Sequence, residues 1–249
     1  MTGLAQQPDL QPSTAFSNPP KIDLDWNTIA ADLNAAGQVT IGPVLSDEEC
    51  GSLIEAYDQQ ALFRSRVVMG RHGFGRGEYQ YFNYPLPQLI ADLRRSFYPH
   101  LALIANQWLE MTGRQGAYPL DHSDYLRQCH EAGQCLPTPL MLKYQAGDYN
   151  CLHQDIYGDH LFPLQIAILL SDPARDFSGG EFVLTEQRPR MQSRAEVVTL
   201  ARGQAVIFPV NERPVHGTRG VYRVRMRHGV SRVRSGQRHV LGLIFHDAR

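Results

Sequence analysis

The second half of the chain carries a series of short apolar runs, each next to a turn rich in glycine, proline or aspartate. We predict strands within the segments 162–173, 176–184, 203–209 and 237–245. Short strands in series with glycine turns favour a mainly β fold of the jelly-roll type, a cupin-like double-stranded β-helix closed into a barrel. The mouth of such a barrel is a common place for a binding site.

A histidine and an aspartate, His153 and Asp155, stand two residues apart just before these runs. On extended backbone, side chains at positions i and i+2 point to the same side, so both can bind one metal ion. Two histidine nitrogens and one carboxylate oxygen form the facial triad of non-haem Fe(II) oxygenases, which leaves coordination positions open. The spacing alone is a weak signal. Its place ahead of the strands favours a metal site and predicts a second histidine downstream.

Two downstream histidines compete for this role. In the segment 223–228 the arginines occupy one parity, whereas Val224, Met226 and His228 share the other, so His228 would face the apolar interior of a strand. The rival, His216, lies between Pro214 and Gly217 and has the surroundings of a loop residue. The residues alone leave both histidines open.

The order of these motifs resembles a known family. Tyr144, the pair His153-x-Asp155, the turn Ser178-Gly-Gly-Glu181 and the stretch from His228 to Arg238 are similar to the Fe(II)- and 2-oxoglutarate-dependent dioxygenases, in their prolyl-hydroxylase-like branch. The resemblance covers residues from about 138 to 247. More narrowly, the chain from Arg64 to Asp247 is similar to a bacterial group described as nucleic-acid-modifying oxygenases, predicted to remove alkyl groups from damaged bases.

This resemblance assigns roles to single residues. His153, Asp155 and His228 would hold Fe(II), with O2 and 2-oxoglutarate as co-substrates, and Arg238 would bind the distal carboxylate of 2-oxoglutarate. The planar fork of an arginine matches a carboxylate, and a buried guanidinium needs such an anionic partner. Tyr144 is placed like a hydroxyl donor to the co-substrate.

A second resemblance leaves His216 as a possible third metal ligand. His216 precedes Arg232 and Arg238 in a pattern that resembles the AlkB-type demethylases of alkylated bases. The spacing from His228 to Arg238 favours the prolyl-hydroxylase-like alignment instead.

Length and composition predict one folded domain. The chain has 249 residues and 43% hydrophobic content, enough for one sizeable core. We expect a disordered tail at 1–20 and a single domain at 21–249, with helical support at 21–135 and the jelly-roll core at 136–249. Helices are predicted at 26–36, from the Ser46 and Glu49 capping box to about residue 62, and at about 87–111.

Several classes of protein are disfavoured by composition. No apolar run approaches a membrane span, and the N-terminus lacks the pattern of a secretion signal, so we expect a cytoplasmic protein without a membrane partner. The four cysteines form no C-x-x-C pair, which disfavours a zinc knuckle or a disulfide framework. The net charge of −1 limits any positive surface to a local patch.

A candidate substrate-binding segment spans residues 63–82, where arginines, aromatic residues and glycines alternate. This composition predicts a mobile loop that stacks on planar groups and contacts phosphates. The alternative is an ordinary glycine-rich loop whose arginines only keep it solvated. The candidate binding residues are Arg64, Arg66, Arg71, Phe74, Arg76 and Tyr79. Eight further arginines lie between residues 213 and 238 without an intervening carboxylate.

Three functions follow in order of preference. The first is an oxygenase acting on single-stranded or damaged nucleic acid, with the alkyl carbon of an extruded base hydroxylated and lost as an aldehyde. The second is a hydroxylase of a protein side chain or a small metabolite, which the His228-to-Arg238 spacing favours. The third is a non-catalytic jelly-roll binding protein, which the intact ligand set disfavours.

Overall fold

The computed structural model describes residues 23–156 and 158–249, so the predicted tail at 1–20 lies outside the described residues. Helices are concentrated in the N-terminal half and strands in the C-terminal half, as predicted. The described helices are α1 (Trp26–Ala36), α2 (Asp47–Ala56), α3 (Gln88–Met111) and α4 (His122–Glu131), with short 3-10 helices at Gln60–Leu62 and Met69–Arg71.

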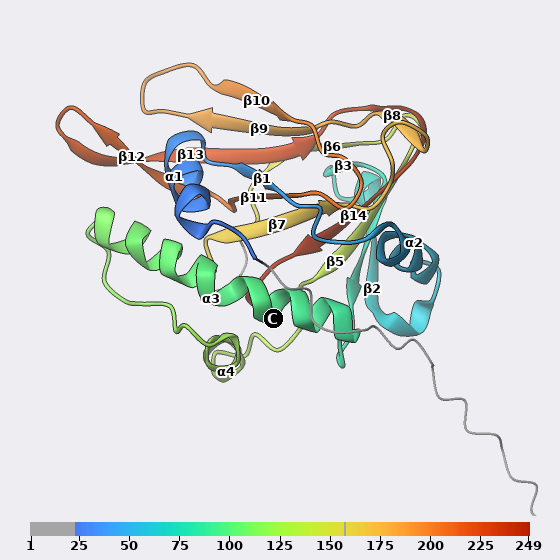
Figure 1. Ribbon diagram of the computed structural model, residues 1–249, viewed down its shortest axis with the longest axis horizontal. Helices are drawn as coiled ribbons and strands as arrows, with labels where there is room; N and C mark the ends of the chain where they lie inside the picture. Colours follow the sequence, from blue (N-terminus) through green and yellow to red (C-terminus); the bar gives the residue numbers. More distant parts are fainter. Residues whose placement is uncertain (1–22, 157) are drawn as a thin grey trace, which may run out of the picture.

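The strands form two antiparallel sheets, which lie as two layers in Figure 1. The larger sheet has the order β1 (Val39–Ile41), β11 (Ala205–Pro209), β7 (Leu164–Leu169), β14 (Val233–Leu243), β5 (Leu140–Gln145), β4 (Glu78–Phe82) and β2 (Phe63–Val68), with β8 (Phe177–Gly179) paired to β14. The smaller sheet has the order β10 (Arg194–Val198), β9 (Phe182–Gln187), β13 (Gly220–Val230), β6 (Tyr149–His153) and β3 (Gly75–Arg76), with β12 (Glu212–Gly217) paired to β13. The mainly β class is confirmed. Strand pairing among the described residues does not join the sheets into a closed barrel.

Strands β7 and β11 of the larger sheet are buried on both faces, and successive side chains along each strand point to opposite faces. In β7, Leu164, Ile166 and Ile168 pack on the side of α3, which Figure 1 shows across the sheet from the smaller one. Ala167 and Leu169 have the opposite parity and pack between the two sheets with residues of β9 and β11. Any polar side chain with this second parity therefore points into the space between the sheets.

The first two helices begin where capping residues predict. Asp25 accepts hydrogen bonds from the first turn of α1, and Gly37 ends that helix with φ of 76°. A Cβ at Gly37 would lie 2.7 Å from the Arg213 side chain, so this position also requires glycine for space. The capping box of Ser46 and Glu49 starts α2. This helix ends at Ala56, and its predicted extension to about residue 62 is wrong because a 3-10 turn leads the chain into β2.

The segment 63–82 is a β-hairpin, and its prediction as a mobile loop is wrong. Strands β2 and β4 pair with each other, and β4 pairs with β5 of the larger sheet. The tip between them contributes β3, which pairs with β6 of the smaller sheet. The aromatic residues of β4 and the two valines at the end of β2 favour a sheet. The helical support expected at 21–135 therefore also supplies strands to both sheets.

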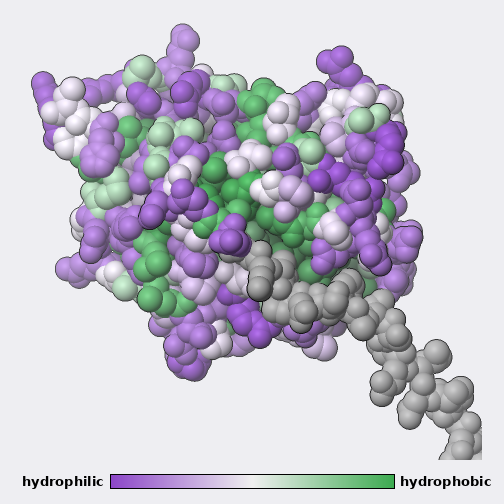
Figure 2. All heavy atoms as spheres, viewed as in Figure 1, coloured by the Kyte–Doolittle hydropathy of each residue, from purple (hydrophilic) through white to green (hydrophobic). Residues whose placement is uncertain are grey.

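The outer surface is mostly hydrophilic on the side shown in Figure 2. Figure 2 shows hydrophilic residues over most of the face seen in Figure 1, with hydrophobic residues gathered near its middle. None of the described helices is long and apolar enough to cross a membrane.

Candidate active site

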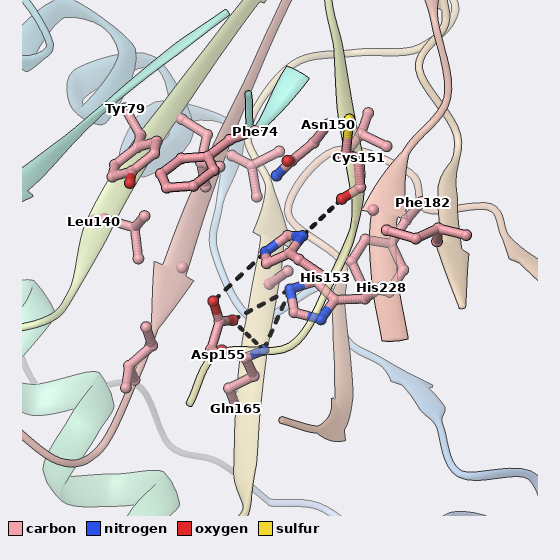
Figure 3. A pocket seen from close by; sticks show the side chains of 18 of the residues that line it. Phe74, Tyr79, Leu140, Asn150, Cys151, His153, Asp155, Gln165, Phe182 and His228 are labelled. Carbon is pink, nitrogen blue, oxygen red and sulfur yellow. Dashed lines mark hydrogen bonds and ion pairs between the residues drawn. The ribbon is translucent and has the colours of Figure 1, made fainter. Parts of the chain in front are cut away.

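Two histidines and one aspartate meet between the sheets. His153 at the end of β6 pairs in register with His228 of β13, and Asp155 follows two residues after β6. The Asp155 oxygens lie 3.5 Å from His153 Nε2 and 3.3 Å from His228 Nε2. One possible ligand atom from each residue lies within 4.8 Å of the other two. The three side chains point toward one another in Figure 3, so they can bind a single ion.

Hydrogen bonds orient two of these side chains. The carbonyl oxygen of Cys151 lies 2.8 Å from His153 Nδ1 and can only accept a hydrogen bond, so Nδ1 carries the hydrogen. Nε2 of His153 is then the ring nitrogen that faces Asp155. The amide of Gln165 in β7 donates to Oδ2 of Asp155 at 2.8 Å. Such contacts fix the orientation of metal ligands.

Electrostatics keep this cluster in a state suited to a cation. Burial alone would raise the pKa of Asp155, but the charges and hydrogen bonds of His228 and His153 hold it far below its usual range. Burial lowers the pKa of His228 and outweighs the opposing effect of Asp155. Asp155 is therefore ionised at neutral pH, and burial favours the neutral form of His228, so both can act as ligands. His153 differs, because burial lowers its pKa but the contacts with Asp155 raise it by more.

An arginine without an anionic partner lies in the same cavity. Arg238 of β14 is 3% exposed, and its Nε and Nη1 have no hydrogen-bond partner among the described residues. Burial lowers its pKa to about 10, so the guanidinium remains charged at neutral pH. Its neighbour in register is Tyr144 of β5, whose ring centre lies 5.7 Å from the guanidinium carbon. A buried cation in this state calls for an anionic ligand.

These groups line one cavity of about 430 Å³ between the sheets. Its wall also carries Phe74 and Tyr79 from the hairpin, opposite His228 in Figure 3. Phe74 is 49% exposed, whereas Tyr79 is partly buried. The cavity therefore combines a possible metal site, a cation for an anionic ligand, and an aromatic rim.

Comparisons with known proteins agree with this geometry. Residues 77–248 match the model of the Oxygenase-NA family, described as an oxygenase catalysing oxidative methylation of damaged DNA. The chain belongs to this family. An uncharacterised protein of Mycobacterium tuberculosis is 46% identical over 194 residues, which cover 76% of this chain and 83% of the relative.

Solved structures show the same fold. A prolyl-4-hydroxylase of Pseudomonas putida aligns with a TM-score of 0.53 and 15% identity, over 90% of this oxygenase and 100% of that chain. An oxidoreductase of the 2-oxoglutarate–Fe(II) oxygenase family from Burkholderia pseudomallei aligns with a TM-score of 0.52 and 17% identity, over 91% and 93%. The oxygenase thus has the fold of a class that works with ferrous iron, 2-oxoglutarate and O2.

The cavity of this oxygenase fits those groups. Two imidazoles and one carboxylate are the donor set that non-haem iron takes. The unpaired guanidinium of Arg238 has the charge and planar shape for a carboxylate of 2-oxoglutarate.

The remaining predicted residues lie elsewhere. His216 is exposed on β12, and Arg232 is exposed with its guanidinium over the Tyr149 ring, so neither lines the cavity. The four arginines of the hairpin also lie outside it. Arg64 donates to the Pro137 carbonyl, and Arg66 pairs with Glu78. Arg76 lies 3.9 Å from Asp148, and Arg71 is exposed.

Two polar residues of the oxygenase cavity were not predicted, because no sequence motif contains them. Gln165 is 4% exposed, and Asn150 of β6 donates to the Tyr144 hydroxyl at 3.4 Å. A usable signal existed for the first of them, because Gln165 interrupts an otherwise apolar strand. A buried polar side chain must find a partner, and here the partner is Asp155.

Proposed function

We propose that the chain is an Fe(II)- and 2-oxoglutarate-dependent dioxygenase that hydroxylates an alkyl carbon on a damaged nucleic-acid base. The observation that carries this proposal is the shared cavity of the His153, Asp155 and His228 cluster and the unpaired Arg238. In this proposal the two sheets are the jelly roll of that enzyme class, with the ligands on the smaller sheet and Arg238 on the larger one.

Each residue has a separate part in the proposed reaction. His153, Asp155 and His228 would hold ferrous iron, which supplies the redox chemistry when bound. Arg238 binds the distal carboxylate of 2-oxoglutarate, and the Tyr144 hydroxyl donates to the same group. Phe182 and Phe208, which pack near the His228 ring, keep bulk water from this side of the site.

The overall reaction balances with O2 as the oxidant. One oxygen atom enters succinate as 2-oxoglutarate loses CO2, and the other becomes a hydroxyl group on the substrate carbon. When that carbon is a methyl group on a ring nitrogen, the hydroxymethyl group leaves as formaldehyde and the nitrogen keeps a proton. The family description speaks of oxidative methylation. The reaction above oxidises a methyl group that is already on the base, so the reaction we propose is demethylation.

Nucleic acid is the preferred substrate for two reasons. The family is described by its action on damaged DNA. In addition, Phe74 and Tyr79 offer aromatic faces at the cavity, where an extruded base can stack. The hairpin arginines add less than their number indicates, because Glu78 and Asp148 already pair with Arg66 and Arg76.

The second candidate is a hydroxylase of a protein side chain or a small metabolite. The wall that contains Leu140, Leu142 and Ile244 is apolar and accepts an aliphatic chain as readily as a ring. A non-catalytic binding protein fits less well, since it leaves the complete set of possible metal ligands without a purpose.

The activity test compares substrates on the same iron-loaded protein. Enzyme reconstituted under nitrogen is mixed with O2, 2-oxoglutarate and methylated single-stranded DNA, unmethylated DNA or proline-containing peptides. We expect succinate in excess of the background and matching formaldehyde with methylated DNA alone. Succinate coupled to peptide hydroxylation would support the second candidate, and no 2-oxoglutarate turnover under any condition would overturn the enzyme proposal.

A binding test separates stacking from charge. Phe74→Ala should weaken single-stranded DNA binding by about 1–3 kcal/mol without changing its salt dependence. Replacing Arg71 and Arg76 by glutamine should flatten the slope of log affinity against log salt by about one unit if both contact phosphates. Leu120→Ala, an exposed apolar residue outside the cavity, is the matched control. If binding were unchanged both in Phe74→Ala and in the arginine variant, the hairpin would not be part of the proposed interface.

A further inference from the structure

The charges of the cavity are few and already engaged. Among the described residues that line it, Asp155 is the only carboxylate and Arg238 the only arginine or lysine. When the proposed groups are bound, the two charges of ferrous iron and the charge of Arg238 offset those of Asp155 and the two carboxylates of 2-oxoglutarate. The loaded cavity then carries no surplus negative charge for a positively charged substrate.

The two carboxylates beside the hairpin, Glu78 and Asp148, are not free either. Glu78 pairs with Arg66 and also accepts a hydrogen bond from the Tyr57 hydroxyl at 3.2 Å. Asp148 lies 3.9 Å from Arg76 and accepts a hydrogen bond from the backbone of Gln145. Both acids near the hairpin are therefore engaged with partners of their own.

Two opposing free-energy terms decide whether a cationic ring binds in this cavity. Stacking a cation on Phe74 or Tyr79 contributes about 0.5–2 kcal/mol. Removing a cation from water without a paired anion costs several kcal/mol. The aromatic attraction is the smaller term, so a charged ring loses affinity on entry, whereas a neutral ring keeps its stacking without that cost.

We propose that the reacting ring of the substrate is neutral, and that the enzyme prefers neutral alkylated bases to cationic ones. This inference rests on the proposed function, because it takes the substrate to be a base. The apolar wall beside the cluster, with Leu140 in β5, gives such a ring a partner on its second side. The preference comes from the cavity and is independent of the hairpin arginines, which do not line it.

A matched pair of lesions tests the preference. 3-Methylthymine and 3-methylcytosine carry a methyl group at the same ring position, but the second is a cation near neutral pH. Both are placed at one site of the same single-stranded oligonucleotide. We expect formaldehyde release to be at least about tenfold faster for 3-methylthymine, equivalent to about 1.4 kcal/mol. Equal rates, or faster release from 3-methylcytosine, would overturn the inference.

A binding measurement keeps this test separate from that of the reaction. Affinities of the two oligonucleotides are measured under nitrogen with manganese and 2-oxoglutarate bound. If neither lesion releases formaldehyde but the neutral one binds more tightly, the charge preference stands and the proposed reaction fails. If neither reacts and both bind equally, the preference fails too.

A charge variant provides the converse test. Leu140→Asp puts a carboxylate into the cavity and should shift the ratio of the two lesions toward 3-methylcytosine by about tenfold or more. Leu120→Asp adds the same charge at an exposed position outside the cavity and should leave the ratio unchanged. An unchanged ratio in a folded, iron-binding Leu140→Asp protein would contradict the charge argument, as would an equal shift in the control.

Discussion

Two buried arginines of this oxygenase have opposite surroundings. Arg94 of α3 donates to Asp247 at 3.1 Å, and the same carboxylate lies 2.9 Å from His130 Nε2 and accepts from the Tyr84 hydroxyl at 2.7 Å. Burial raises the pKa of Tyr84 to about 12, so its hydroxyl remains a donor. We call Arg94, Asp247, His130 and Tyr84 the closure cluster, because they attach the C-terminal segment to the helices.

The cavity contains similar residue types, but fewer short contacts join its charged groups. Arg238 has no carboxylate partner among the described residues, and its Nε and Nη1 are both unsatisfied, whereas Arg94 leaves Nε alone unsatisfied. Asp155 lies more than 3.2 Å from either histidine nitrogen, which is longer than the contacts of Asp247. In the closure cluster the carboxylate of Asp247 has three partners within the protein, so we expect the cluster to stabilise the fold. The groups of the cavity can instead bind ligands.

The largest expected effect distinguishes the three residues of the proposed iron site from the other histidines. His153→Ala, Asp155→Ala and His228→Ala should each abolish stoichiometric iron binding and 2-oxoglutarate turnover, since the triad then lacks one ligand. Metal content after reconstitution and succinate release measure the two effects. His216→Ala, on the exposed strand β12, should retain both. Loss in the control with retention in His228→Ala would assign the third ligand to His216.

The closure cluster should respond in stability alone. Asp247→Ala leaves Arg94 charged and buried, and we expect the free energy of unfolding to fall by about 3–5 kcal/mol. Urea denaturation measures this change. The affinity of the remaining folded protein for 2-oxoglutarate should not change. A weaker co-substrate affinity with unaltered stability would mean that the cluster serves the cavity.

Arg238 should show the reverse behaviour. Arg238→Leu is expected to weaken 2-oxoglutarate binding by about 2–5 kcal/mol, because the distal carboxylate loses its partner in a buried site. The free energy of unfolding should stay the same or rise, since a buried charge without a protein partner is removed. Titration calorimetry with a redox-inactive metal measures the first effect and urea denaturation the second.

Arg232→Leu is the control for this comparison, because Arg232 is exposed and does not line the cavity. It should change neither quantity by more than about 0.5 kcal/mol. Equal losses of 2-oxoglutarate affinity in both variants would favour the alternative alignment, in which the two arginines act together.

Local patterns explain what the sequence predicted well. The capping residues of α1 and α2 act within one turn, and the parity of His228 depends on its own strand. The mainly β class and the oxygenase family could be predicted for the same reason, since the motifs lie in short continuous stretches. The ligand roles of His153, Asp155 and His228 remain a prediction, which the geometry supports.

Long-range contacts explain what the sequence did not predict. The segment 63–82 has the composition of a loop, yet β4 becomes a strand because the edge of β5 is available to pair with it. The closure cluster joins Tyr84, Arg94 and His130 to Asp247, which is more than 110 residues away from each of them. No local sequence pattern predicts a partner that is so distant along the chain. The role of Gln165 depends in the same way on the position of Asp155.

The smallest expected effect concerns Gln165. Its side-chain amide connects β7 of the larger sheet to Asp155 of the proposed iron site. Its donation to Oδ2 of Asp155 at 2.8 Å leaves Oδ1 free to act as the ligand. Gln165→Leu removes the donor and keeps a similar volume. We expect metal affinity to fall by about 10–100-fold, the usual cost of losing a partner that orients a ligand. Manganese binding followed by electron paramagnetic resonance measures this loss without any turnover.

A second buried glutamine separates orientation from general stability. Gln80 is 7% exposed and donates to the Tyr57 carbonyl at 2.8 Å, away from the cavity. Gln80→Leu therefore also loses one buried amide contact, but its manganese affinity should stay unchanged. If Gln165→Leu retained wild-type affinity, Asp155 would be oriented by its histidine neighbours alone. The group of His153, Asp155 and His228 would then resemble the closure cluster more closely, because its residues would hold one another in position.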